Sequence, residues 1–294
     1  MKMKYISRIR SGLRGYNRID SKKATARIID GSYNSVYKGR SMNFDELREY
    51  VPGDNIKDMD WKASARSGRL LVKQYIAEKK HNIMFVMDTT KRMLADTMAG
   101  QEKRDVAIMS AGTLAYMVNR QRDYIGAVFS EGKGICSIPF SSELLSVEIM
   151  LQKYHDYVTM DNNSDINDSL EYIVCNFKQR MIVVIVTDID GVSRIQENVL
   201  RRLLVKHDVI LINIGDVDIA GSNVYDVETG SYLPEFFTGN KKLICRIEEQ
   251  RRRKLAECET KLKRYGVAHS TIQDINCLDK QLGELLDKHR SEKR

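Results

Sequence analysis

Two aspartates, Asp88 and Asp188, each directly follow a short apolar segment and are the residues of this 294-residue chain best placed to do chemistry. Hydroxyl side chains adjoin both carboxylates, because Thr89 and Thr90 follow the first and Thr187 precedes the second. Carboxylate and hydroxyl oxygens are the ligands that Mg²⁺ prefers in proteins. The alternative is that each aspartate only caps the helix that follows it.

The apolar segments that must position these aspartates are residues 83–87 and 181–186. Such runs alternate along the chain with stretches of helical periodicity, expected near 103–120, 141–156, 166–178, 194–205, 247–265 and 278–289. This alternation predicts an α/β fold with a doubly wound, mostly parallel sheet of the Rossmann type. Further strands are expected at 124–129, 135–138, 209–214 and 267–273, the first two as an edge hairpin. Ligands of such sheets bind beyond the carboxyl ends of the strands, so the two carboxylates converge if their strands are neighbours.

Composition excludes several classes of protein. Apolar residues make up 42% of the chain, which excludes a disordered protein. The longest uninterrupted apolar run, residues 181–186, is far shorter than the roughly 20 residues that a membrane span needs. The five cysteines have no zinc-ligand spacing, and no Gly-x-x-x-x-Gly-Lys phosphate loop is present. We therefore expect a reduced, cytoplasmic protein.

The positive charge is concentrated at the beginning of the chain. The net charge is +10 over residues 1–80 and −2 over residues 81–294. This asymmetry predicts a basic N-terminal segment, 1–80, and an α/β domain, 81–294. Residues 6–16 carry a helical apolar stripe, which we expect to pack on the protein's own domain, whereas residues 31–60 are expected to be irregular and residues 70–76 alternate as in a strand. Nucleic-acid binding by the basic segment stays open, beside an acidic partner and a merely solvated tail.

Two motifs carry a resemblance to known families. The run DTTKRM at 88–93 resembles the opening of the metal-ion-dependent adhesion site in von Willebrand factor A-type domains. The signature of the bacterial "domain of unknown function 58" family is closely similar to GRSMNFDELREYVPGD at 39–54 and MDWKASAR at 59–66. The resemblance implies a von Willebrand factor A-like fold for residues 81–294.

The resemblance also implies a metal site. Its ligands would be Asp88, Thr90, Ser164 and Asp188, with Ser164 taken from the run NSDI at 163–166. Arg92 departs from the family pattern, because a serine is usual there. Two converging carboxylates need a nearby cation. Either Mg²⁺ binds there with Arg92 turned away, or the Arg92 guanidinium replaces the metal.

The signature segment contains a second set of candidates. Oppositely charged residues surround the only tryptophan of the chain, and the candidates for partner binding, with Arg92, are Arg48, Asp54, Asp60, Trp61 and Arg66. One interpretation is an internal ion-pair network that holds this loop on the sheet domain. The other is a recognition surface, since tryptophan and arginine dominate interface energetics.

Two functions from different classes compete. The family resemblance implies a non-enzymatic protein-binding adaptor that works with a MoxR-type AAA+ ATPase in assembly or activation of client proteins. The alternative is a haloacid-dehalogenase-like phosphatase, because residues 188–192 match its Asp-x-Asp-Gly-Val pattern, with Asp188 as nucleophile and Asp190 as acid/base. Such enzymes usually carry that motif on their first strand, which disfavours the alternative. The two differ in whether phosphate esters are hydrolysed.

Overall fold

The chain forms two compact units in the computed structural model, which describes residues 3–13, 43–76, 80–132, 134–216, 225–226, 231–232 and 241–291. Met1–Ser32 and His81–Arg294 make up the first unit, here called the sheet domain, and Tyr33–Lys80 make up the second, here called the signature unit. The predicted features at 31–42 and most of 216–240 lie outside the described residues.

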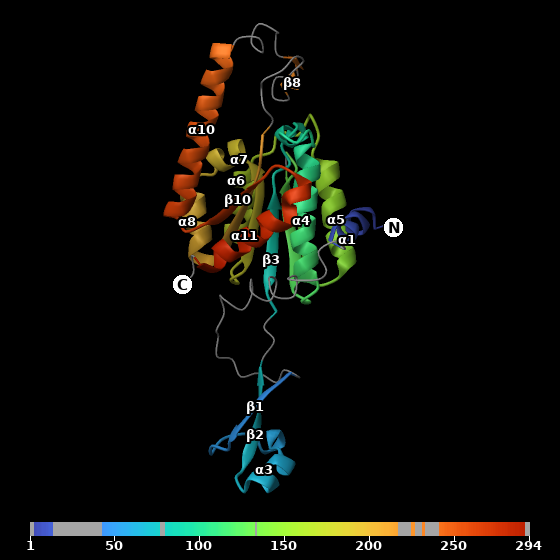
Figure 1. Ribbon diagram of the computed structural model, residues 1–294, viewed down its shortest axis with the longest axis vertical. Coiled ribbons are helices and arrows are strands. Elements are labelled where there is room, and N and C mark those ends of the chain that lie inside the picture. The colour runs from blue at the N-terminus through green and yellow to red at the C-terminus, as the bar shows by residue number, and fades with distance from the viewer. Residues whose placement is uncertain are drawn as a thin grey trace. The chain divides into compact units, whose positions relative to one another are not determined.

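A six-stranded sheet forms the centre of the sheet domain (Figure 1). Its strands are, in spatial order, β10 (Ala268–Ile272), β7 (Asp208–Ile214), β6 (Ile182–Asp188), β3 (Asn82–Met87), β4 (Tyr124–Ser130) and β5 (Ile135–Ser141). All neighbours pair in parallel except β4 and β5, which form an antiparallel hairpin at one edge. The predicted doubly wound, mostly parallel α/β fold and its edge hairpin are thus confirmed.

Helices cover both faces of this sheet. One face packs against α4 (Lys103–Asn119), α5 (Leu144–Tyr157) and α11 (Leu278–Ser291), and α1 (Lys4–Leu13) lies outside this layer against α4 and α5. The other packs against α6 (Ile166–Asn176), α7 (Ile189–Arg194), α8 (Glu197–Lys206) and α10 (Lys241–Arg264). Shorter elements of this unit are η2 (Lys91–Leu94), η3 (Ile275–Cys277), β8 (Tyr225–Asp226) and β9 (Ser231–Tyr232). Because both faces are covered, the middle of each central strand is apolar, and polar residues lie near the strand ends.

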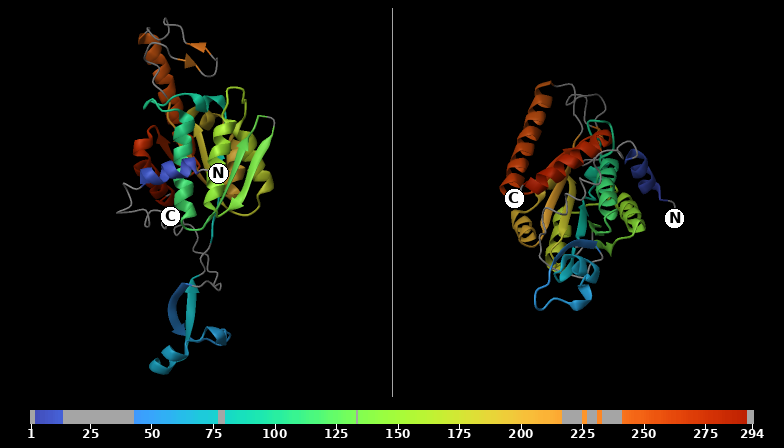
Figure 2. Two further views of the ribbon diagram at one scale, coloured as in Figure 1. Left: turned by 90° about the vertical axis from the view of Figure 1, so that its right-hand side faces the viewer. Right: turned by 60° about the horizontal axis from the view of Figure 1, so that its bottom comes forward.

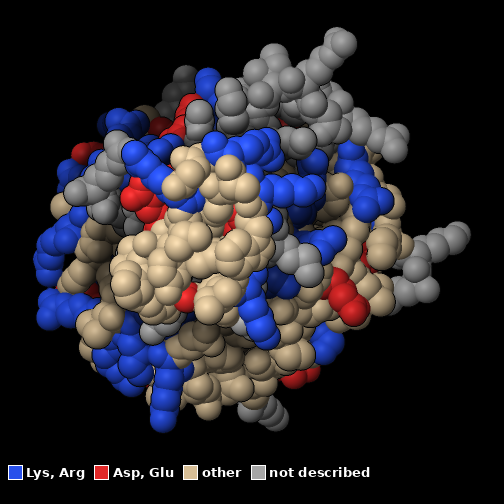
Figure 3. Space-filling view, turned by 90° about the horizontal axis from the view of Figure 1, so that it is seen from below, with Lys and Arg blue, Asp and Glu red and all other residues tan. Residues whose placement is uncertain are grey.

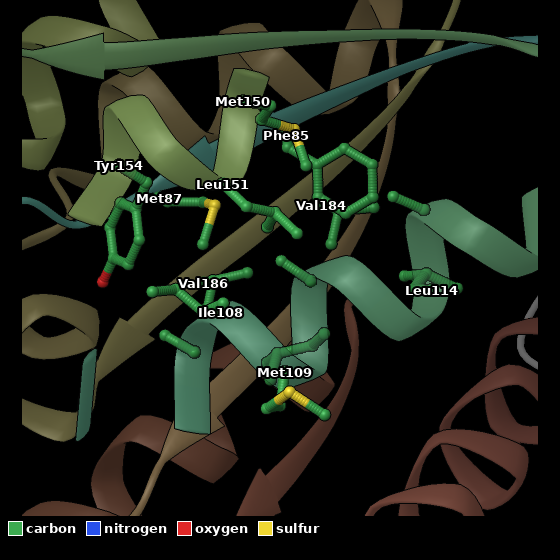
Figure 4. Packing of buried hydrophobic residues seen from close by; sticks show 14 of the residues in the cluster. Phe85, Met87, Ile108, Met109, Leu114, Met150, Leu151, Tyr154, Val184 and Val186 are labelled. Atoms are coloured by element: carbon green, nitrogen blue, oxygen red, sulfur yellow. The ribbon is translucent and has the colours of Figure 1, made fainter. Parts of the chain in front are cut away.

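Helix α4 is the central helix of the larger core. It is apolar around most of its circumference because it contacts the sheet on one side and both α1 and α5 on others. Figure 4 shows Ile108 and Leu114 of α4 near Phe85 of β3 and Val184 of β6, with Met150 and Leu151 of α5 completing the packing.

The first helix belongs to the sheet domain. Tyr5, Ile6 and Ile9 of α1 are buried against α4 and α5, and Figure 2 shows α1 lying across α4. The buried carboxylate of Glu148 accepts hydrogen bonds from the backbone N–H groups of Tyr5 (3.0 Å) and Ile6 (2.9 Å). The prediction that this helix packs on its own domain is confirmed. The predicted segment 1–80 is therefore divided between the two units. Its first helix belongs to the sheet domain, because the apolar side of that helix is buried there.

The signature unit is more regular than the sequence indicated. Strand β1 (Asn43–Glu49) pairs antiparallel with β2 (Leu71–Ile76), and η1 (Ile56–Asp58) and α3 (Trp61–Ser67) lie between them. Asp60 caps the first turn of α3 and Gly68 ends that helix in the left-handed conformation. The expectation of an irregular region is wrong here, because capping and hairpin pairing order a segment whose apolar periodicity is weak.

Among the described helices, none combines the length and apolarity needed to cross a bilayer. Lysine and arginine side chains are numerous on the surface seen in Figure 3, consistent with the net charge of +8.

Candidate functional site

Asp88 and Asp188 meet at the carboxyl edge of the sheet. Strands β3 and β6 are neighbours, with Met87 opposite Val186, so Asp88, which follows β3, and Asp188, the last residue of β6, lie at the same edge. The backbone N–H of Asp88 donates to the carbonyl of Val186 (2.8 Å), and the Thr187 hydroxyl donates to Asp88 Oδ2 (2.6 Å). The neighbouring strands that the sequence interpretation required are therefore present.

Arg92 lies between the two carboxylates. It belongs to η2, a single turn that folds back directly after β3. Its Nη2 donates to Asp88 Oδ2 (3.0 Å), and its Nε donates to Asp188 Oδ1 (3.4 Å). The Arg92 guanidinium thus bridges the two carboxylates for which the sequence predicted a shared cation.

Lys103 supplies a second cation that the sequence analysis missed. It is the first residue of α4, and its Nζ donates to Asp188 Oδ2 (3.1 Å) and to Asp216, which follows β7. A lysine in the first turn of a helix opposes the helix dipole, so it needs a compensating anion. A lysine at the start of a predicted helix was therefore the signal in the sequence that an anion lies nearby. Only the fold identifies the anions as Asp188 and Asp216.

The ion pairs of this cluster are almost fully removed from solvent. The exposed fractions of Asp88, Asp188 and Lys103 are 2%, 0% and 3%. Burial raises the pKa of Asp188, but Lys103, Arg92 and the Gly191 N–H lower it further, so the net pKa lies below its ordinary value. Burial likewise lowers the pKa of Arg92 and Lys103, and their carboxylate partners more than offset this. All three groups are therefore held in their charged forms.

Backbone donors complete the coordination of both carboxylates. Asp88 Oδ1 accepts from the Thr90 N–H (2.9 Å), and Asp188 Oδ1 accepts from the Gly191 N–H (2.8 Å) as the N-cap of α7. Each of the four carboxylate oxygens thus has at least one protein donor. A Cβ at Gly191 would lie 1.9 Å from the Thr187 Oγ1, so this close approach requires glycine.

The hydroxyl groups at this edge have different partners. Ser164 Oγ lies 3.0 Å from Thr89 Oγ1, which donates to the carbonyl of Ser130 (2.5 Å). The Thr90 hydroxyl is buried and has no hydrogen-bond partner in the described structure. From α5, the Tyr154 hydroxyl donates to the carbonyl of Asp88 (3.0 Å), and burial raises the pKa of this tyrosine well above its ordinary value. These contacts link the loop after β3 to neighbouring elements.

The residues implied as metal ligands do not fit a divalent cation in this arrangement. Asp88 and Asp188 already interact with Arg92 and Lys103, so a metal would have to displace at least one buried cation. The Thr90 hydroxyl oxygen has no hydrogen-bond partner, but the Ser164 hydroxyl is hydrogen-bonded to the Thr89 hydroxyl. Within the described residues there is no group of three or more His, Cys, Asp or Glu side chains that could hold a metal ion.

The two aspartates of the phosphatase pattern lie in different surroundings. Asp188 is buried among its cations, whereas Asp190 is partly exposed and pairs with Lys254 of α10. Asp188 has no uncommitted carboxylate oxygen for attack on phosphorus. The geometry therefore offers no support for Asp188 as a nucleophile.

The candidates in the signature unit fall into two groups. Arg48 forms a two-pronged ion pair with Asp54 (2.7 and 2.6 Å), and Asp60 caps α3 through the Ala63 N–H (3.0 Å). These side chains hold the unit itself together. Trp61, by contrast, is 61% exposed. Arg66, also exposed, reaches only the carbonyl of Lys62 (3.3 Å) in the described structure.

Comparisons with known proteins agree with the signature motif. The model of the family described as "Protein of unknown function DUF58" matches residues 46–253. The uncharacterized proteins Rv1480 of Mycobacterium tuberculosis and Mb1516 of Mycobacterium bovis are each 24% identical over 214 residues, which cover 69% of this chain. The chain spans 66% of the length of these relatives, just under two thirds.

Solved structures with a similar fold include two bacterial proteins. The conserved hypothetical protein BatB from Bacteroides thetaiotaomicron is 12% identical, with a TM-score of 0.44, and the match covers 72% of this chain and 99% of that one. A von Willebrand factor type A protein from Catenulispora acidiphila is 11% identical, with a TM-score of 0.40, and the match covers 75% of this chain and 44% of that one.

Proposed function

Because this chain belongs to the DUF58 family, whose function is unknown, we propose that it is a non-enzymatic protein-binding module whose sheet edge is neutralised by its own side chains instead of Mg²⁺. The observation that carries the proposal is the buried cluster of Asp88, Asp188, Arg92 and Lys103. In it, two carboxylates face two cations and every carboxylate oxygen has a protein donor.

This cluster supports a binding role over an enzymatic one. The carboxyl edge is where open α/β sheets place their reactive groups. Here the acidic groups at that edge are buried and paired, so they serve to fix the loop after β3, η2 and the start of α4 relative to each other. A rigid edge that holds several loops in place suits recognition of another protein.

The partner we propose is the one that the family resemblance implies, a MoxR-type AAA+ ATPase. The chain has no Gly-x-x-x-x-Gly-Lys phosphate loop of its own, so ATP hydrolysis would belong to the partner. The purified chain should bind the purified MoxR-type ATPase of the same genome in isothermal titration calorimetry, with unchanged affinity in EDTA. If no binding is detected either with or without ATP, the MoxR-type ATPase is not the partner.

Metal independence is tested by thermal denaturation of the full chain in Mg²⁺ and in EDTA. The melting temperature of the wild type should be the same in both, because Arg92 and Lys103 occupy the cation positions. Arg92→Ser opens one of these positions and restores a hydroxyl, so Mg²⁺ should stabilise only this variant. Stabilisation of the wild type by Mg²⁺, reversed by EDTA, would refute the proposal.

The phosphatase alternative is tested separately with p-nitrophenyl phosphate in Mg²⁺. We expect no turnover above that of an Asp188→Asn variant. Wild-type hydrolysis that this substitution abolishes would instead establish an enzyme.

A further inference from the structure

Helix α3 of the signature unit presents an exposed surface that the internal contacts of the unit do not use. Trp61, Lys62, Ala65 and Arg66 are exposed, while Ser64 faces inward and donates to and accepts from the backbone of Leu71. We name the set Trp61, Lys62, Ala65 and Arg66 the α3 face. Because Ala65 is small, it leaves the indole and the two long cationic side chains accessible.

The aromatic ring is the first unusual feature of this surface. Trp61 is 61% exposed, although tryptophan is normally buried over most of its area. Five of the large hydrophobic residues exposed in the described structure belong to this one small unit: Leu47, Val51, Ile56, Trp61 and Leu70. Such concentration of exposed apolar side chains is typical of an interaction surface.

The charges beside the ring are the second feature. Three other cations of the unit are paired internally, Arg48 with Asp54, Arg69 with Glu49 and Lys73 with Asp60. Lys62 and Arg66 form no ion pair with a carboxylate in the part of the unit that the structure describes. This balance favours an anionic partner over a cationic one.

We infer that the α3 face docks an acidic segment of a partner protein, with Trp61 covering an apolar side chain and Lys62 and Arg66 pairing with carboxylates next to it. Tryptophan and arginine together are the residue types that most often dominate binding energy. The inference rests on the proposed role as a protein-binding module, and it adds a contact on the signature unit to the one proposed for the sheet edge.

Trp61 itself provides the measurement, because it is the only tryptophan of the chain. The full chain is titrated at 50 mM salt with a twelve-residue peptide of glutamate and leucine, and with the matching glutamine and leucine peptide. We expect the acidic peptide to shift Trp61 emission to shorter wavelengths and to bind at least tenfold more weakly at 500 mM salt, since ion pairs at exposed sites are screened. The glutamine peptide should bind at least tenfold more weakly at 50 mM.

Variants separate this surface from general electrostatic attraction. Lys62→Gln with Arg66→Gln should weaken binding of the acidic peptide at least tenfold. Lys57→Gln with Lys263→Gln removes the same charge from exposed residues outside the α3 face and should change the affinity less than twofold. Circular dichroism establishes that both double variants remain folded.

Three results would overturn the inference. The first is no binding of the acidic peptide, and the second is equal weakening in both double variants. The third is tighter binding of duplex DNA or of phosphatidylserine vesicles that depends on the same two cations. Failure of the MoxR-type ATPase to bind, with the acidic peptide still bound at the α3 face, would refute the proposed partner and leave this surface standing.

Discussion

At the scale of single residues, the buried charges at the carboxyl edge fix the loop after β3, η2 and the start of α4 relative to each other. Asp188 has two cationic partners, and Asp88 shares one of them, so removal of a single cation leaves an excess of buried negative charge. An uncompensated buried charge costs far more than a lost surface pair.

Lys103→Met tests this directly. It should lower the free energy of unfolding at pH 7 by about 3–5 kcal/mol, because Asp188 then keeps only Arg92 as its cation. Lys103 contributes to the depression of the pKa of Asp188, so its stabilisation is present above the ordinary carboxyl pKa of about 4 and is lost as the pH falls below it. The difference between variant and wild type in urea denaturation should therefore shrink below pH 4.

A matched control is Lys254→Met, which removes the partly exposed partner of Asp190. Its cost should be below about 1 kcal/mol, as for other surface pairs. Equal costs for the two variants would show that the buried cluster has no special importance for stability.

Gly191→Ala is a second prediction at this scale. The added Cβ would overlap Thr187 Oγ1 at 1.9 Å and approach Asp88 Oδ2 at 2.8 Å, both of which are fixed by hydrogen bonds. We expect a loss of about 1–3 kcal/mol, the usual cost of overpacking, measured by urea denaturation. Gly283→Ala, in α11 with no atom within 4 Å of the new Cβ, should instead stabilise by about 0.5–1 kcal/mol. Loss of stability in both variants would contradict the explanation.

At the scale of elements, α1 is attached by one carboxylate and one apolar side. Glu148 of α5 accepts the N–H groups of Tyr5 and Ile6, and Ile9 lies close to Gly112 of α4, where a Cβ would approach its Cδ1 to 2.5 Å. The helix therefore depends on residues more than 100 positions away for its N-terminal cap.

Glu148→Gln should release this helix locally. The two N–H groups bond to different carboxylate oxygens, and the glutamine amide keeps only one of these acceptors, so one N–H loses its partner and we expect a loss of about 1–3 kcal/mol. Hydrogen exchange at the amides of Tyr5 and Ile6 should become correspondingly faster. Glu143→Gln changes the exposed N-cap residue of α5, the helix that carries Glu148. It should leave both amides exchanging as slowly as in the wild type.

The junction between α8 and β7 predicts a dependence on pH. His207 is buried there, and burial, with a smaller effect of Lys206, lowers its pKa below the ordinary value near 6.5. The unfolded chain therefore takes up a proton before the folded chain does, and stability should fall as the pH drops from 7 towards the lowered pKa. Urea denaturation of His207→Gln should show a smaller fall over this interval, and an unchanged slope would contradict the assignment.

At the scale of the whole molecule, the two units have very different cores. The sheet domain buries two apolar layers, one on each face of its sheet. In the signature unit, Val72 is the only hydrophobic residue found buried among those whose burial is described. A small unit with so little buried surface has little stability of its own.

We therefore expect two separate unfolding transitions. Trp61 fluorescence should report the signature unit and change at a lower urea concentration than far-UV circular dichroism, which mainly follows the helices of the sheet domain. Arg48→Ala, which breaks the pair with Asp54, should shift only the fluorescence transition. Coincident transitions in the wild type and in this variant would show that the molecule unfolds as one unit.

The sequence by itself determined the alternation of strands and helices and the placement of Asp88 and Asp188 at the ends of two apolar strands. Both follow from local periodicity, since a fully buried strand is apolar at every position. The start and end of α3 depended on Asp60 and Gly68, which are also local, but the weak apolar pattern concealed that helix.

Only the tertiary structure decided which charges neutralise the aspartates and which helix Glu148 caps. Lys103 and Asp216 are 113 residues apart, and Glu148 and Ile6 are 142 apart. Such pairs leave no periodic trace in a single sequence, because each contact depends on the strand order and on how the helices pack. For the same reason, only the tertiary structure distinguishes the exposed side chains of the α3 face from the internal pair of Arg48 and Asp54.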